Sequence, residues 1–201
     1  MKRKISLLLV LVMAVTLFAG CKKNNENNND TNNTGDTTGS VSQQAPESAL
    51  QILQNVWNAY GEDEKFAVIG GNLENPVDNA PGDFDMSYAE NLTGNLVIPA
   101  DQLAKVKSAA LMVHMMNANT FTAGAVQLND GNDAAAFAQT MQSALQNNQW
   151  ICGTPEKLLI ATFTGNYVLV AFGVEDAMGT FQSKLAAVYP NVSIAYAENI
   201  A

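Results

Sequence analysis

A single histidine lies in a methionine-rich segment, and this combination of side chains could bind a transition metal. His114 is the only histidine of the 201 residues, and Met112 and Met116 lie two positions to either side of it. Alternate residues of a strand share one face, so an extended segment would place these three side chains together. Thioethers and imidazole suit Cu(I). The alternative is a structural strand whose methionines fill the core while the histidine lies at a solvated edge.

Hydrolytic chemistry has weak support in the sequence. A Ser-His or Cys-His pair needs a base within reach of the nucleophile, and the one histidine lies in an apolar segment. No Gly-x-Ser-x-Gly, His-Glu-x-x-His or phosphate-binding glycine motif is present. Paired carboxylates could still cleave a glycan, but the spacing of the 19 acidic residues selects no pair. A carboxylate hydrolase is therefore kept as the catalytic alternative.

Acidic and aromatic side chains gather in the segment 61–95, most of which is predicted to be a loop. A loop of this length inside a compact domain is commonly functional. We therefore expect a ligand or a partner to bind at Asp83, Phe84, Asp85 and Tyr88. The alternating oxygens there also resemble a calcium loop, but the turn glycine and the distant carboxylate of such loops are missing.

The amino terminus has the pattern of a bacterial lipoprotein signal. Three cations at positions 2–4 precede an almost uninterrupted apolar run over 5–17, and the small residues Ala19 and Gly20 precede Cys21. This is the order of a secretory signal, and the run is short for a membrane span. Because the segment resembles a lipobox, we expect acylation of Cys21 and attachment to the outer face of the cell membrane. An ordinary secretory signal with a chance cysteine is the alternative.

Three segments follow from this interpretation. Residues 1–20 are the signal peptide, residues 21–45 are the lipidated cysteine and a flexible tether, and residues 46–201 are one globular domain. The tether is rich in Asn, Thr, Gly and Ser, a composition that cannot bury enough apolar surface to fold. With Cys21 acylated, Cys152 has no partner in the chain, and we expect it to be a buried small hydrophobe. A reactive thiol or an intermolecular disulfide is the alternative.

The charge of the chain argues against a nucleic-acid partner. Signal cleavage removes three of the 10 basic residues and none of the 19 acidic ones, which moves the formal net charge from −9 to −12. Such a surface repels phosphate backbones. No motif requires a cofactor, so we expect none.

Apolar periodicity defines most of the predicted elements. Helical spacing appears over three segments, strand-like apolar runs or alternation over five, and Gly165–Asn166 predicts a hairpin turn. The predicted helices cover residues 50–60, 133–146 and 175–188, with a short one over 100–106. The predicted strands cover residues 109–116, 124–128, 158–163, 167–172 and 192–197. Asn132 or Asp133 would cap the second long helix.

These elements predict an α+β domain. The second half of the chain repeats the order strand, strand, helix, and ends on a strand. The expected architecture is a mostly antiparallel sheet of about four to five strands with helices packed on one face. Residues 167–172 are apolar on both faces, which indicates a central strand.

The methionine-rich strand over 108–116, the helix over 133–149 and the Gly165–Asn166–Tyr167–Val168 hairpin together resemble a known family. They resemble uncharacterised Firmicute lipoproteins, best matched by domain of unknown function 4358. The resemblance covers roughly residues 99–185, and it implies that the chain is a membrane-anchored lipoprotein with the same fold. It implies no activity and no functional residues.

The sequence therefore predicts a noncatalytic surface module that binds a small ligand or an envelope protein. The alternatives are a wall-active hydrolase with two facing carboxylates and a structural or assembly component with one apolar patch.

Overall fold

The computed structural model describes residues 46–116, 120–129, 134–151 and 153–200. The chain divides into a unit Met1–Ser40 and a unit Val41–Ala201, and the description below concerns the second unit alone. The predicted signal peptide, the tether with Cys21, the capping residues Asn132 and Asp133, and Cys152 all lie outside the described residues.

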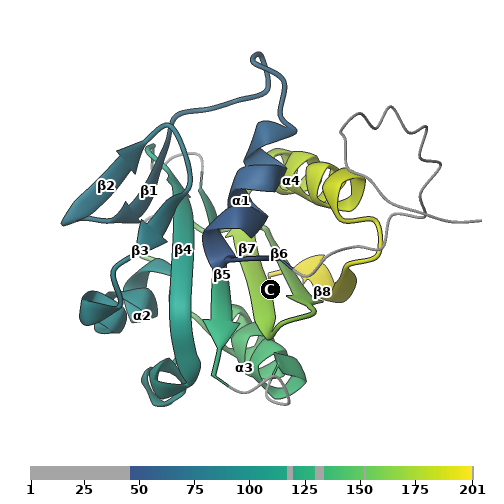
Figure 1. Ribbon diagram of the computed structural model, residues 1–201. Helices are drawn as coiled ribbons and strands as arrows, with labels where there is room; N and C mark the ends of the chain where they lie inside the picture. The colour runs from purple at the N-terminus through teal and green to yellow at the C-terminus, as the bar shows by residue number, and fades with distance from the viewer. Residues whose placement is uncertain (1–45, 117–119, 130–133, 152, 201) are drawn as a thin grey trace, which may run out of the picture. The chain divides into compact units, whose positions relative to one another are not determined.

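An antiparallel sheet forms the centre of the domain (Figure 1). Within the described residues it has eight strands, in the order β2-β1-β4-β5-β7-β6-β8, and β3 pairs with β4 beside β1. The strands are β1 Val68–Asn72, β2 Asn75–Asp78, β3 Gly82–Phe84, β4 Val106–His114, β5 Phe121–Leu128, β6 Lys157–Phe163, β7 Tyr167–Gly173 and β8 Ser193–Asn199. The α+β class and the antiparallel sheet are confirmed, but the expected four to five strands were too few.

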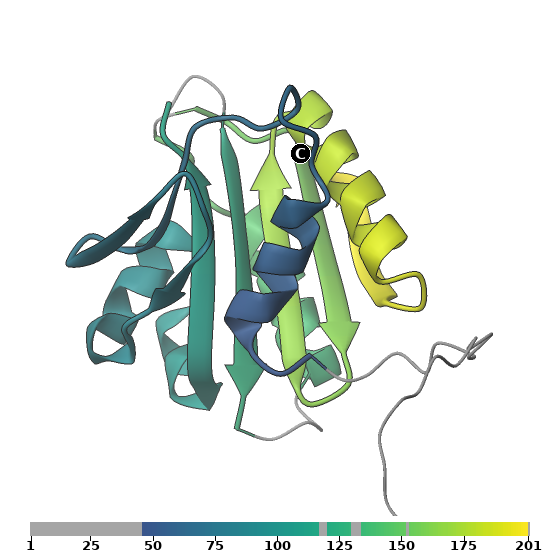
Figure 2. The same cartoon turned by 45° about the horizontal axis from the view of Figure 1, so that its top comes forward.

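Helices cover both faces of this sheet, which corrects the expected single layer. The helices are α1 Ala49–Asn58, α2 Leu92–Asn95, α3 Ala134–Gln146 and α4 Glu175–Val188, with 3-10 helices at Met86–Asn91 and Ala100–Lys105. Figure 2 shows α1 and α4 in front of the strands and α3 behind them. The physical reason lies in β7, which is buried at every residue. A strand that is apolar on both faces needs a covering layer on each side.

The first core lies between the sheet and the helices α1 and α4. The sheet presents small side chains there, among them Ala110, Ala123 and Ala125, while the helices contribute Phe181 and other large side chains. Small residues on the strands let the helices approach closely. The serine at the start of α1 caps it, because the Ser48 hydroxyl accepts a hydrogen bond from the Gln51 N–H.

The second core lies on the opposite face, where α3 contributes Phe137, Met141 and Leu145. The segment between β3 and β4 completes this layer, with Leu92 and other apolar side chains buried against the sheet. Because alternate residues of each strand point to opposite faces, every central strand contributes to both cores.

The predicted loop over 61–95 is in fact largely structured. It contains β1, β2, β3, a 3-10 helix and α2. Two glycines allow the backbones to cross closely there: a Cβ atom on Gly70 would lie 2.2 Å from the Gly82 backbone nitrogen. β2 has no apolar alternation that would predict it, since all four of its residues are exposed and one of them is Pro76.

The β6–β7 hairpin turns where the sequence predicted it. Both Gly165 and Asn166 have positive φ angles, of 82° and 70°, as a tight hairpin turn requires. The turn fixes a register in which Phe163 pairs with Tyr167 and Leu158 with Phe172. None of the helices in the described ranges is long and apolar enough to cross a membrane.

Candidate functional site

The predicted metal ligands occupy three different environments around the end of β4. Met112 is fully buried in the first core, His114 lies at the last position of the strand, and Met116 is 58 % exposed beyond it. The His114 Nδ1 atom accepts a hydrogen bond from the Met116 N–H at 2.9 Å. One ring nitrogen is thus occupied, and a metal ion could reach the Met112 sulfur only through the core. Among the described residues, no three His, Cys, Asp or Glu side chains gather to hold a metal ion.

The four residues predicted to bind a ligand in the 61–95 segment do not form one open surface. Phe84 is buried in the second core, and Tyr88 packs against the same core. Asp85 caps the 3-10 helix: it accepts hydrogen bonds from the Ser87 N–H and hydroxyl, which lower the pKa of the Asp85 carboxyl. Asp83 is exposed on β3. Phe84, Asp85 and Tyr88 therefore have structural roles, and the binding role of all four residues stays a prediction.

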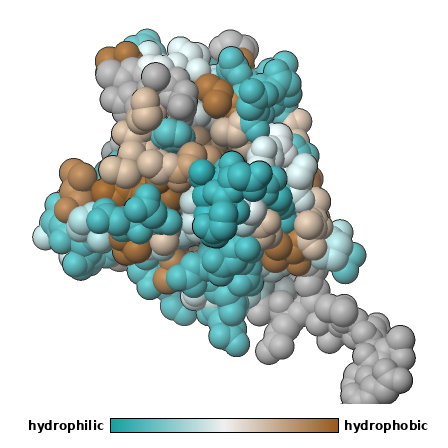
Figure 3. All heavy atoms as spheres, turned by 90° about the horizontal axis from the view of Figure 1, so that it is seen from above, coloured by the Kyte–Doolittle hydropathy of each residue, from teal (hydrophilic) through white to brown (hydrophobic). Residues whose placement is uncertain are grey.

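A hollow of about 410 Å³ opens instead at the upper end of the first core. We call it the rim pocket. It is lined by Tyr60, Glu64, Phe66, His114, Val174, Asp176, Ala177 and Thr180. The residues come from the α1–β1 connection, the end of β4 and the first turns of α4, which the sheet brings together. Figure 3 looks onto this end of the molecule, where hydrophilic and hydrophobic side chains alternate over the surface.

The floor of the rim pocket is aromatic. Phe66 stacks on the His114 imidazole, with ring centroids 4.9 Å apart and planes 10° from parallel. The edges or faces of Trp57, Tyr60 and Phe121 surround the Phe66 ring, with centroids between 5.3 and 6.3 Å away. These contacts fix the position of His114, because the ring is held on one face by Phe66 and through Nδ1 by the backbone.

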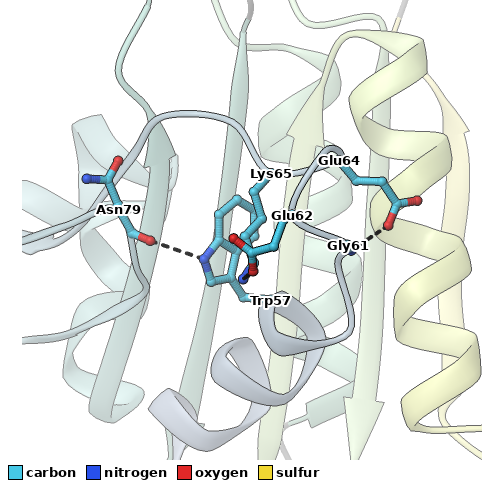
Figure 4. A network of polar contacts seen from close by, with 6 residues as sticks. All are labelled: Trp57, Gly61, Glu62, Glu64, Lys65 and Asn79. Carbon is cyan, nitrogen blue, oxygen red and sulfur yellow. Dashed lines mark hydrogen bonds and ion pairs between the residues drawn. The ribbon is translucent and has the colours of Figure 1, made fainter.

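The wall formed by the α1–β1 connection carries an ion pair. Glu64 extends from this connection towards α4, and its carboxylate also accepts a hydrogen bond from the Gly61 N–H (Figure 4). The Lys184 ammonium of α4 donates to the same carboxylate oxygen at 2.5 Å. The Lys184 bond, and then the Gly61 bond, lower the pKa of Glu64. The end of α1, from which this connection starts, is tied to the β2–β3 connection by the Trp57 indole, which donates to the Asn79 carbonyl at 3.2 Å (Figure 4).

Two polar groups of the pocket have no partner among the described residues. The Tyr60 hydroxyl is buried without a hydrogen bond, and burial followed by the charge of Glu64 raises the pKa of that phenol. The Asp176 carboxylate is exposed and makes no hydrogen bond or ion pair within the described part of the chain. Its neighbour Glu175 differs, because it pairs with Lys157 at 2.7 Å. An unsatisfied buried hydroxyl is rare in a folded protein and requires an explanation.

The surroundings of His114 favour its neutral form. Partial burial lowers the pKa of its imidazole below the ordinary value of 6.5. Because Nδ1 accepts a hydrogen bond from the Met116 N–H, the proton of the neutral ring lies on Nε2. The Nε2–H group has no acceptor among the described residues, so it is available to a ligand.

No protein-family model matches this chain, and no curated protein or solved structure shows significant similarity to it. The resemblance to Firmicute lipoproteins of unknown function therefore stays a prediction. The residues of the site must be interpreted from their own chemistry.

Of the rim pocket, the sequence singled out only His114 as a functional residue. The predicted helices over 50–60 and 175–188 included Tyr60 and Asp176. The structure confirms Asp176 in the first turn of α4, but α1 ends at Asn58, so Tyr60 lies just beyond that helix. Neither position showed that the two side chains share a pocket, since they are far apart in the sequence. Glu64 and Phe66 lie in the segment 61–95, but no motif in the sequence selected them as binding residues.

The unpartnered Tyr60 hydroxyl leads to a prediction about stability. We expect Tyr60→Phe to raise the free energy of unfolding by about 1 kcal/mol, because it removes a buried polar group that has no partner. Tyr189→Phe is the matched control: its hydroxyl accepts a hydrogen bond from the Asn55 amide at 2.9 Å, so its loss should cost about 1 kcal/mol. Urea denaturation measures both. If Tyr60→Phe destabilised as much as Tyr189→Phe, the Tyr60 hydroxyl would have a partner in solution.

Proposed function

We propose that this chain is an outward-facing bacterial lipoprotein, acylated at Cys21, whose domain binds a small ligand in the rim pocket without catalysing a reaction. The observation that carries the binding proposal is the pocket itself, which is lined by aromatic rings and by the unpartnered Asp176 carboxylate. A hollow that combines apolar rings with a few polar groups is the usual form of a ligand site.

The electrostatics of the pocket favour binding over hydrolysis. Glu64 and Asp176 do line one hollow, as a two-carboxylate hydrolase would require. A glycosidase, however, needs one carboxyl group whose pKa is raised so that it can donate a proton. The Lys184 and Gly61 hydrogen bonds lower the pKa of Glu64, which suits a fixed anion. Hydrolysis is therefore the less favoured function.

The proposed localisation rests on the sequence of the amino terminus. The cationic start, the apolar run and the small residues before Cys21 favour acylation and a membrane anchor. The domain itself is acidic: residues 46–201 hold only five of the basic residues. The partners that we propose are thus the membrane, through the Cys21 lipid, and a small ligand or an envelope protein, with nucleic acid disfavoured by charge.

A pocket-filling variant tests the binding proposal. Ala177→Trp places a large side chain in the rim pocket, and Ala187→Trp places the same side chain on the exposed face of α4 as a control. We expect some members of a panel of metabolites, sugars, peptides and amines to raise the melting temperature of the wild type and of the control, but not of Ala177→Trp. At about 100 times its dissociation constant, a ligand adds roughly 2.7 kcal/mol. Hits that persist in Ala177→Trp, or no hits at all, would contradict the proposal.

The proposed lipid anchor is tested on the same chain, recovered from its native membrane. Mass spectrometry should find an amino terminus at Cys21 with a diacylglyceryl group on its sulfur. A chain that begins elsewhere, or that carries no lipid, would contradict this part of the proposal while leaving the pocket untouched.

A further inference from the structure

Charge and aromatic surface together restrict what the rim pocket can hold. Its lining includes two carboxylates, on Glu64 and Asp176, and no lysine or arginine. The nearest cation, Lys184, is already paired with Glu64. No ion pair of the described residues involves Asp176, so its carboxylate is the one acidic group of the pocket left without a counterion there.

The protein itself shows how this corner holds an ammonium group. The Lys184 Nζ atom lies 5.7 Å from the centre of the Tyr60 ring and donates to the Glu64 carboxylate. An ammonium between an aromatic face and a carboxylate is the arrangement by which proteins bind organic cations. On the other side of the pocket, Asp176 is a second carboxylate beside the stacked rings of Phe66 and His114, and no ammonium group of the described residues pairs with it.

We infer that the rim pocket binds an organic ammonium ion between the Asp176 carboxylate and the aromatic rings of Tyr60, Phe66 and His114. This inference rests on the proposed function, since it names the ligand class of the same pocket. The hollow of about 410 Å³ accommodates a small amine with its apolar substituents on the rings. The His114 Nε2–H group supplies a hydrogen bond to a polar substituent of the same ligand.

Choline and dimethylbutanol, in which a carbon atom replaces the choline nitrogen, differ in charge and hardly in shape. The full-length chain is titrated with each, and the imidazole proton signals are followed by NMR. Because His114 is the only histidine, these signals come from one residue, which lines the rim pocket. We expect choline to shift them with an affinity about tenfold higher than that of dimethylbutanol. Equal affinities, or no shift with choline, would overturn the inference.

Two isosteric variants test which carboxylate attracts the ammonium ion. Asp176→Asn and Glu175→Gln each remove one negative charge from the first turn of α4, but Glu175 already binds Lys157. We expect Asp176→Asn to weaken choline binding about fivefold and Glu175→Gln to change it less than about twofold. Equal losses in the two variants would mean that general surface charge attracts the cation, and the assignment to Asp176 would be wrong.

The pH dependence gives a further readout that a structural role would not produce. The titratable side chains that line the pocket together with His114 are Tyr60, Glu64 and Asp176, and Glu64 is paired with Lys184. A bound cation opposes protonation of His114, so saturating choline should lower the measured pKa of His114, while dimethylbutanol should not. If dimethylbutanol binds the pocket as well as choline does, the ligand class is wrong but the binding function stands. If no panel member binds there, the proposed function itself fails.

Discussion

Replacement of Gly70 by alanine is expected to lower the free energy of unfolding by about 3 kcal/mol or more. The added Cβ atom would lie 2.2 Å from the Gly82 nitrogen, 2.3 Å from the Ala80 oxygen and 2.6 Å from the Pro81 carbonyl carbon. All three are backbone atoms of the segment leading into β3, so no side chain can rotate away. The strain can be relieved only if β1 and β3 separate, which would expose the hydrogen bonds that both strands make to β4.

Gly179→Ala is the matched control for this substitution. Gly179 lies on the exposed face of α4, and a Cβ atom there would meet nothing within 4 Å. Alanine is the better helix residue, so we expect this variant to gain roughly 0.5–1 kcal/mol. Urea denaturation of both variants shows whether each one lowers or raises the free energy of unfolding. A Gly70→Ala protein within 1 kcal/mol of the wild type would show that the β1–β3 crossing is looser than the structure indicates.

The same crossing explains why this part of the fold escaped prediction. Local patterns predict strands when apolar residues alternate, yet β2 consists of four exposed residues, one of them Pro76. A proline is tolerated because β2 is the edge of the sheet and pairs only with β1. The strand exists because β1 offers it a partner, and sequence periodicity carries no information about such a partner.

The elements that the sequence did predict are those with strong local determinants. Gly165 and Asn166 adopt the positive φ angles of a tight turn, and Ser193–Asn199 pairs with β6 as the last strand. The predicted number of helical layers was wrong. The apolar pattern of residues 167–172 was used to predict a central strand, but a strand buried at all seven residues also requires helices on both faces of the sheet.

Prediction of the site was limited for a different reason. His114 was selected for its chemistry, and the structure places it in the rim pocket. The methionines beside it misled, because Met112 serves the core and Met116 is exposed outside the strand. Asp176 and Tyr60 lie beside His114 only through the sheet order, in which β5 separates β4 from β7 and α4 follows β7. Pairwise proximity of this kind is a property of the tertiary structure.

Two phenylalanines test whether both faces of the sheet carry a true core. Phe137 of α3 and Phe181 of α4 are fully buried, on opposite faces. We expect Phe137→Ala and Phe181→Ala each to lower the free energy of unfolding by about 3–5 kcal/mol, because each leaves a cavity that the neighbouring side chains cannot fill. Urea denaturation measures the loss, and Gln139→Ala on the exposed side of α3 should stay within about 0.5 kcal/mol of the wild type.

The comparison between the two phenylalanines decides the architecture. If α3 merely lay against a finished domain, Phe137→Ala would behave like Gln139→Ala while Phe181→Ala kept its full cost. If both layers are cores, the two losses are similar, and they add within about 0.5 kcal/mol because the two sites share no partner across the sheet. Should an alanine variant fail to fold, Phe137→Leu and Phe181→Leu remove less volume and preserve the comparison at a cost of about 1 kcal/mol each. With two independent cores, the second core stabilises the sheet from its other face. The domain can then leave the rim of the first core open as a pocket.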